Sequence, residues 1–240
     1  GRALACIEIG RHKNCVQTHA RRREEHADIV RMIRMDEFEF PPPTPSDLGD
    51  KEIVRESDAL DGVRVALLVT GGIAAMKTPF VARALRRHGA SVTAFCTEEA
   101  LRYVAQDALA WSTNSPVITK LSASAEHLSD DAPFDVYLVA PATAASIGRM
   151  AHGIAEGAVG ATLACAIGRM EQGRAKVLVA PTMHGTMHNS ILVKALGELN
   201  DIGVRIIPPR DAYGKHNLPD ESTLVSEVCN AVSALRLRRG

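Results

Sequence analysis

The amino-acid sequence predicts an α/β protein whose sheet is doubly wound and mostly parallel. From Val63 onward, short runs of apolar, β-branched residues alternate with longer segments in which apolar residues recur at helical spacing. Glycine, proline or aspartate bounds each short run, as is typical of buried strands between tight turns. These observations favour one domain of about 180 residues with helices packed against the sheet.

Each predicted element follows from its local pattern. The runs that carry the strand pattern are residues 63–69, 91–95, 134–139, 176–179 and 204–207, with 117–119 as a weaker candidate. The segments with helical spacing are residues 76–88, 98–106, 144–155, 191–200 and 223–235. Because ligands bind at the carboxyl ends of the strands in such folds, the residues that follow each strand are the candidate site.

The charged residues balance, with 28 Lys and Arg against 28 Asp and Glu, so the chain lacks the net positive charge of a general nucleic-acid binder. No apolar run approaches the roughly 20 residues needed to span a bilayer, and the first residues lack the apolar core of a secretory signal. We therefore expect a cytoplasmic protein that binds neither nucleic acid nor membranes. Five cysteines, an odd number, favour reduced thiols over a disulfide framework.

Residues 1–60 differ from the rest and are expected to form a partly ordered N-terminal extension. They hold most of the runs of Arg, Glu and His, and a proline-rich linker at residues 41–47. Zinc could in principle be surrounded by Cys6, His12, Cys15 and His19. The usual pattern of two closely spaced cysteines is missing, so no metal site is predicted. Residues 61–240 are expected to form the functional domain.

A glycine pair, Gly71 and Gly72, directly follows the first predicted strand in the run VTGGIAAMK. Glycines at this place in a doubly wound sheet let backbone N–H groups approach a phosphate. A plain tight turn is the alternative, because the third glycine of GxGxxG and the GK[ST] of a P-loop are missing. After the second strand, Thr97 offers a hydroxyl at the same edge, although it could equally be a helix N-cap.

The third and fourth strands both end in an Ala-Pro pair followed by small or polar residues, in APATAAS and APTMHGTMH. Small side chains at the end of a strand leave room for a flat ring, and proline stiffens the backbone beside it. Taken singly, each proline could merely end its strand. Both pairs together with the glycine turn favour one ligand site at this edge of the sheet.

The motifs VTGGIAAMK, AFCTEEA, APATA, APTMHGTMHNS and VRIIPP, in this order, resemble those of the homo-oligomeric flavin-containing cysteine decarboxylases. The resemblance covers roughly residues 62–230 and includes His127, which stands 14 residues before the proline of APATA. It implies a Rossmann-like flavoprotein three-layer sandwich that binds FMN without a covalent link. It also implies a small-molecule substrate and assembly into trimers or multiples of trimers, with FMN at the subunit boundary.

The resemblance assigns a role to each matching residue. Contacts with FMN are implied for Gly71, Gly72, Ile73, Thr97, Pro141, Ala142, Thr143 and Ala144. Contacts with the substrate are implied for Met183 and His184, with Lys77 as a nearby positive charge. His127 matches the catalytic histidine of the family, and a histidine titrates near neutral pH and can take, give or orient a proton. The alternative for His127 is a solvated surface residue.

The implied reaction is the FMN-dependent decarboxylation of a cysteine-derived carboxylate such as phosphopantothenoylcysteine. The chain departs from the family where Ala145 and His184 each replace an asparagine, and where residues 210–218 contain no cysteine. An imidazole can still donate a hydrogen bond to a carboxylate. The missing cysteine leaves a second function open, that of an FMN-dependent NAD(P)H oxidoreductase reducing a pterin such as dihydromethanopterin. A non-catalytic flavin-binding subunit is the third alternative.

Overall fold

The computed structural model describes residues 40–128 and 132–239 of the chain. It divides into two units, Gly1–Asp47 and Leu48–Gly240, which are treated separately. In the first unit, residues 40–46 form neither helix nor strand, in keeping with the prolines of the predicted linker. The four residues considered as zinc ligands, Cys6, His12, Cys15 and His19, lie outside the described residues.

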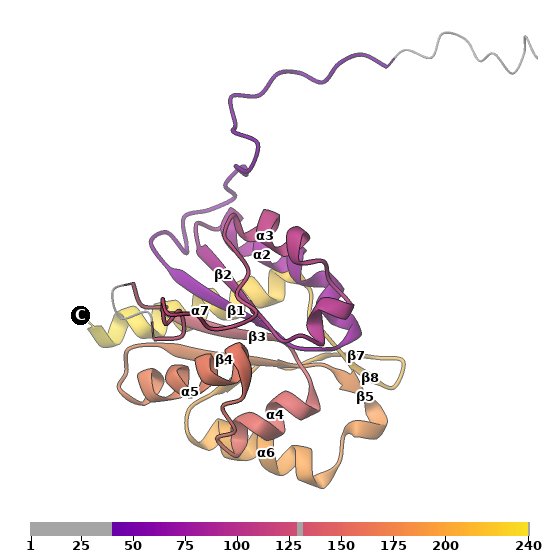
Figure 1. Cartoon of the computed structure of the whole chain (residues 1–240), viewed down its shortest axis with the longest axis vertical. Coiled ribbons are helices and arrows are strands. Elements are labelled where there is room, and N and C mark those ends of the chain that lie inside the picture. Colours follow the sequence, from indigo (N-terminus) through magenta and orange to yellow (C-terminus); the bar gives the residue numbers. More distant parts are fainter. Residues whose placement is uncertain (1–39, 129–131, 240) are drawn as a thin grey trace, which may run out of the picture. The chain divides into compact units, whose positions relative to one another are not determined.

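A five-stranded parallel sheet forms the centre of the second unit (Figure 1). Its strands are β1 (Arg64–Val69), β2 (Ser91–Cys96), β3 (Val136–Ala142), β4 (Lys176–Pro181) and β6 (Arg205–Ile206). They lie in the order β2-β1-β3-β4-β6, and every neighbouring pair is parallel. The predicted strands and the doubly wound fold are therefore confirmed. Ile118, in the weaker candidate, adds a single parallel bridge to Phe95.

Helices cover both faces of this sheet and complete three layers (Figure 1). One face carries α2 (Thr78–Arg87), α3 (Gln106–Thr113) and α7 (Glu221–Arg239). The other carries α4 (Ala144–Ala151), α5 (Gly157–Glu171) and α6 (Ser190–Asp201). Successive strand residues alternate between the two cores: Leu67 packs on the first face and Leu68 on the second. Two buried cores explain why the strands read as continuous apolar runs.

The predicted helices differ from the structure at three places. A helix over residues 98–106 is wrong: only the 3₁₀ turn η2 (Ala100–Arg102) forms, because the backbone is extended at Ala105 (φ −69°, ψ 136°) and α3 starts after it. The helix predicted over 144–155 ends at Ala151, because Gly153 takes a positive φ of 66° that closes the helix end. Helix α5 was not predicted, although Val159, Leu163, Ala166 and Met170 carry helical spacing on its buried side.

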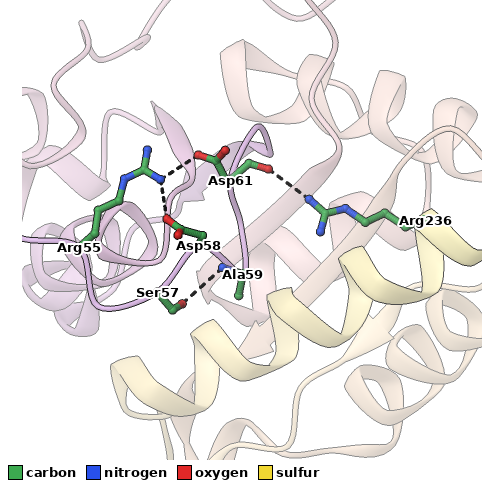
Figure 2. Close-up of polar contacts among 6 residues, drawn as sticks. All are labelled: Arg55, Ser57, Asp58, Ala59, Asp61 and Arg236. Carbon is green, nitrogen blue, oxygen red and sulfur yellow. Dashed lines mark hydrogen bonds and ion pairs between the residues drawn. The ribbon is translucent and has the colours of Figure 1, made fainter.

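The segment of residues 55–61, which precedes β1, packs against the rest of the second unit. Leu60 is fully buried, and its N–H donates to the carbonyl of His88 at 2.8 Å. Arg55 pairs with Asp58 and Asp61, and Arg236 of α7 donates to the carbonyl of Asp61 at 3.1 Å (Figure 2). These contacts join the segment to α2 and α7 of the same unit.

Gly89, between α2 and β2, has a positive φ of 99°, and a Cβ atom there would lie 2.9 Å from the backbone nitrogen of Asp61. Replacing Gly89 by alanine is expected to lower the free energy of unfolding by about 2–4 kcal/mol, because the cost of the strained backbone and the cost of overpacking are added together. Urea unfolding measures the loss. Gly173→Ala is the matched control, because Gly173 also has a positive φ (71°) but open space around it. An equal loss in the two variants would contradict the packing role of Gly89.

Among the described residues, no helix combines the length and apolar character needed to cross a bilayer. In the same part of the chain, no three His, Cys, Asp or Glu side chains are grouped so that they could hold a metal ion.

Candidate active site

Strands β1 and β3 are neighbours at the centre of the sheet, with β2 beside β1 and β4 beside β3. This strand order creates a crevice between β1 and β3. In a doubly wound sheet the chain leaves such a pair toward opposite faces, and ligands bind at the carboxyl ends there. A cavity of about 670 Å³ lies at this edge, bounded by Gly72 after β1 and Thr143 after β3. Its volume falls within the range of about 300–1,000 Å³ found for ligand sites.

The cavity brings together three of the motifs that the sequence singled out. The predicted site residues that line it are Gly71, Gly72, Ile73, Lys77, Pro141, Thr143, Ala144, Met183 and His184. Ala142 is not among them, because its side chain is buried in the core at the end of β3. The segments meet because the parallel strands that precede them all end at one edge of the sheet.

The hydroxyl of Thr70 joins the end of β1, just before the glycine pair, to the Ala-Pro end of β3. Thr70 is fully buried, and its Oγ1 donates to the carbonyl of Pro141 at 2.7 Å. The same oxygen accepts from the N–H of Thr143 at 3.1 Å. Thr143 in turn caps α4 by accepting from the N–H of Ser146. The turn after β1 and the first turn of α4 are therefore held in one geometry by a single side chain.

Neighbouring residues leave no room for a side chain at Gly71 and little at Gly72. A Cβ atom at Gly71 would overlap the Cβ of Glu99 and lie 3.1 Å from its carbonyl carbon. One at Gly72 would lie 3.2 Å from Cγ2 of Thr143. Within residues 40–128 and 132–239, the backbone N–H groups of these two glycines have no protein acceptor. Two unused N–H donors at a cavity wall fit an anionic group such as a phosphate.

A small antiparallel sheet has the strand order β5-β8-β7 (Figure 1). Its strands are β5 (Met183–His184), β7 (Arg210–Ala212) and β8 (Lys215–Asn217). Residues of β5 and β8 form another wall of the cavity. Tyr213 and Gly214 form the hairpin turn with positive φ values of 54° and 65°. Residues 215–218 line the cavity, and sequence reasoning gave them no role. The Tyr-Gly turn between short polar runs was the available signal for this hairpin.

The charges around the cavity favour an anionic ligand. Lys77 and Lys215 line it together with His184 and His216. The described residues that line it include no carboxylate. A cationic wall with no opposing acid attracts carboxylates and phosphates.

The ring of His184 is oriented by its own turn. Its Nδ1 accepts from the backbone N–H of Thr186 at 3.2 Å, and Oγ1 of Thr186 lies 2.8 Å from the same nitrogen. A ring nitrogen that accepts an N–H bond carries no proton, so the proton of the neutral ring is on Nε2. His184 is therefore oriented as a donor on the lining of the cavity.

Thr97 lies beside this site, on the wall of a second cavity of about 580 Å³. Its N–H donates to the carbonyl of Val69 at 3.1 Å, which places it next to the end of β1. Its hydroxyl accepts from the N–H of Ala100 at 3.2 Å, in the turn before η2, although the N-cap residue of η2 is Glu99. Unlike the first cavity, the second is lined by carboxylates, those of Glu98, Glu99 and Glu156.

His127 is half-buried and lines neither of these cavities. Its Nδ1 is buried and has no hydrogen-bond partner among the described residues. An unsatisfied buried donor or acceptor costs about 1–3 kcal/mol, so such an atom in a folded protein calls for an explanation. Whether His127 is catalytic stays a prediction.

No thiol of the described chain lines the first cavity. Burial raises the pKa of the Cys96 thiol to about 12. It also raises the pKa of Cys229, which packs against the core from α7 as expected of a structural thiol. Both side chains are therefore protonated at neutral pH and unsuited to thiolate chemistry.

The sequence of the chain is similar to bifunctional proteins of coenzyme A biosynthesis. It is 32% identical over 178 residues to CoaBC of Thermococcus kodakarensis, covering 72% of this chain and 43% of that protein. It is 30% identical over 179 residues to CoaBC of Methanocaldococcus jannaschii, covering 74% of this chain and 43% of that protein. The chain thus spans less than half the length of these relatives.

Solved structures share the fold. The FMN-dependent cysteine decarboxylase SpaF matches with a TM-score of 0.62 at 24% identity, over 72% of this chain and 99% of that one. A mutant PPC decarboxylase complexed with pantothenoylaminoethenethiol matches with a TM-score of 0.60 at 21% identity, over 69% and 96%. The model of the flavoprotein family matches residues 53–233, which hold the whole sheet and the cavity. The chain therefore belongs to the flavoprotein family.

Proposed function

We propose that the chain binds FMN in the cavity at the ends of β1, β3 and β4 and decarboxylates a cysteine-derived carboxylate. The observation that carries this proposal is the meeting of three motifs, far apart in the sequence, around one cavity in a member of the flavoprotein family. Phosphopantothenoylcysteine is the first substrate to test, because the relatives in sequence are named for coenzyme A biosynthesis.

The residues of the cavity fit FMN. The unused N–H groups of Gly71 and Gly72 would hold the phosphate, with Ile73 and Thr97 beside it. Pro141, Thr143 and Ala144 present small or flat surfaces along which a ring can lie. When bound, FMN would supply the oxidant for the cysteinyl thiol, and the oxidised sulfur would provide the electron sink that loss of CO₂ requires.

The chain itself would bind, orient and protonate the substrate. His184, a donor through Nε2, would hold the substrate carboxylate beside Met183, and Lys77 would add a positive charge at the cavity wall. His127 would serve as the acid or base. Because His127 lies outside the cavity lining of its own chain, we place it at the cavity of a neighbouring copy.

Exposed apolar side chains support assembly of the chain with copies of itself, and trimers or multiples of trimers are the assembly that the family resemblance implies. Ile73, Met76 and Met187 line the cavity and are 70%, 55% and 45% exposed. Phe80 of α2 and Ile191 of α6 are 63% and 77% exposed. Apolar surface of this kind is covered in interfaces. Light scattering on the FMN-loaded chain should give a multiple of three times 25.7 kDa, and a monomer would contradict the assembly.

The proposed function is tested by a spectrum and two reactions. The chain loaded with FMN should absorb near ~450 nm, as bound flavin does. Added phosphopantothenoylcysteine should then release CO₂ under anaerobic conditions. Bleaching of the flavin by NADPH or NADH without CO₂ release would instead support the pterin reductase. The absence of a cysteine from residues 210–218 favours that second function. No retention of FMN would overturn the proposal.

Replacing His184 by alanine is expected to raise KM for the substrate about 10-fold or more, with FMN affinity unchanged. A hydrogen bond to a charged group contributes about 1.5–3 kcal/mol, and 1.4 kcal/mol corresponds to tenfold. Steady-state CO₂ release gives KM and kcat separately. His152→Ala is the control, because His152 is exposed at the end of α4 and lines no part of the cavity. An unchanged KM in the His184 variant would remove its assigned role.

A further inference from the structure

The pairing of β8 with β5 places two polar side chains next to each other on the wall of the cavity. Lys215 of β8 and His184 of β5 are directly opposite each other in this antiparallel pair. Side chains of directly opposite residues leave their strands on the same side, with Cβ atoms about 4.5–5.5 Å apart. Both residues line the cavity, but of the two the proposed function gives a role only to His184.

The other polar side chains that β8 brings to the cavity already have partners for their donors. Nδ1 of His216 lies 2.6 Å from Oδ1 of Asp211, and its Nε2 lies 2.9 Å from Nδ1 of His188, so these three side chains form one hydrogen-bonded series. The amide nitrogen of Asn217 donates to two backbone carbonyls of the same hairpin, at 3.1 and 3.3 Å. Lys215 is therefore the residue of β8 whose donors are left for a ligand.

The positive charge of Lys215 is not neutralised within the described chain. None of the ion pairs between described residues includes Lys215. Asp211 lies opposite His216 in the β7–β8 pair, whereas the residue opposite Lys215 is Ala212. Because successive residues of a strand point to opposite sides, Asp211 and Lys215 lie on different sides of the hairpin. The described lining of the cavity also holds no carboxylate, so this ammonium group can pair with a ligand.

Contacts at two places hold the hairpin against the segment that follows β5. At the tip, the N–H of Gly185 donates to the carbonyl of Gly214 at 3.0 Å, and a Cβ atom at Gly185 would overlap that carbonyl oxygen. Farther along, the bond between His216 and His188 joins β8 to the same segment. The backbone of Lys215 therefore keeps a constant spacing from the residue opposite it.

We infer that Lys215 and His184 together hold the carboxylate of the substrate. The inference rests on the proposed function, which places that carboxylate at His184. A carboxylate has two oxygens that only accept hydrogen bonds, and the two residues offer one donor group each, Nε2–H and the ammonium group. Neither donor group has to leave another partner in the described chain to make these bonds. Lys215 also supplies the charge that makes such a hydrogen bond strong.

The first test is steady-state CO₂ release from phosphopantothenoylcysteine by the full FMN-loaded chain. Lys215→Met removes the charge at similar side-chain length and should raise KM about 10-fold, with kcat and the flavin spectrum little changed. Lys215→Arg keeps the charge and should raise KM less. Lys194→Met is the matched control, because Lys194 is an exposed lysine of α6 that lines no part of the cavity. Its KM should equal that of the unaltered chain.

The decarboxylated product separates the two anionic groups of the substrate. Phosphopantetheine keeps the phosphate, which a lysine can also bind, but has no carboxylate. As an inhibitor of CO₂ release, it should bind to the Lys215→Met chain and to the unaltered chain with the same Ki. A Ki that rises by the same factor as KM would place Lys215 at the phosphate and overturn the inference.

A double variant tests whether the two residues hold the same group. The combined His184→Ala and Lys215→Met variant should raise KM by less than the product of the two single factors, because losing either contact loosens the group that the other holds. Factors that multiply would assign the residues to separate groups and overturn the inference, as would an unchanged KM in Lys215→Met. These results leave the decarboxylase standing. An unaltered chain that releases no CO₂ overturns the proposed function, and the inference with it.

Discussion

Gly71→Ala should bind FMN at least about 100-fold more weakly than the unaltered chain. The added Cβ would overlap the Cβ of Glu99 and approach its carbonyl carbon, so the turn after β1 must move. Movement displaces the N–H groups proposed to hold the phosphate. Charge-assisted hydrogen bonds contribute about 1.5–3 kcal/mol each, so the loss of one or two accounts for this factor. Titration of the flavin-free chain with FMN, followed by absorbance or calorimetry, gives the Kd.

The matched control is Gly168→Ala, which adds the same methyl group inside helix α5, where nothing lies within 4 Å. Its FMN affinity should equal that of the unaltered chain, and its stability should rise by about 0.5–1 kcal/mol because alanine favours a helix. Circular dichroism shows whether Gly71→Ala remains folded despite the overpacking. A Gly71 variant that binds FMN with unchanged Kd would show that the phosphate lies elsewhere.

His127→Asn should lower CO₂ release by about 10²–10⁴-fold, the contribution of a positioned acid or base. Asparagine keeps hydrogen-bonding capacity but cannot titrate near neutral pH. The FMN spectrum and the stability should change little, because Nδ1 of His127 has no hydrogen-bond partner in the described residues that the change could break. Stopped assays of CO₂ release in the two proteins measure the effect, with His152→Asn as the control.

Mixed oligomers show whether His127 acts at a neighbouring cavity. A Gly71→Ala chain lacks a competent FMN site but keeps His127, and a His127→Asn chain has the reverse defect. If the two residues serve one site from different copies, refolding both chains together restores part of the activity. Mixtures as inactive as their components would place both in one chain, and an active His127→Asn chain would end its catalytic role.

The strands of the parallel sheet were predictable because the residue pattern that indicates each strand lies within a few consecutive positions. Each β-branched run is buried on both faces between two cores, so its apolar character is continuous and visible in the sequence. The helix boundaries were less visible. Ala105 interrupts the helix predicted over 98–106 with an extended backbone, although nothing in its residue type demands this. Gly153, by contrast, ends α4 with a positive φ, which its residue type allows.

The cavity was predictable in part for the same reason. Its motifs directly follow strands, and strands that run in parallel carry them to one edge. The Tyr-Gly turn could have indicated the β7–β8 hairpin, but two- and three-residue strands leave no periodicity that shows where the hairpin packs. Lys215 and His216 reach the cavity only through the antiparallel pairing of β8 with β5.

Residue type and order along a few neighbouring positions were enough to predict the α/β class, the glycine turn, the two Ala-Pro strand ends and the family resemblance. The strand order, which opens the crevice between β1 and β3, depends on long-range pairing and is seen only in the folded chain. The folded chain also shows that Thr70 ties two motifs together and that Asp211, His216 and His188 join in one series. Such contacts link residues distant in the chain, and only the packing of the two sheets and their helices sets which of them meet.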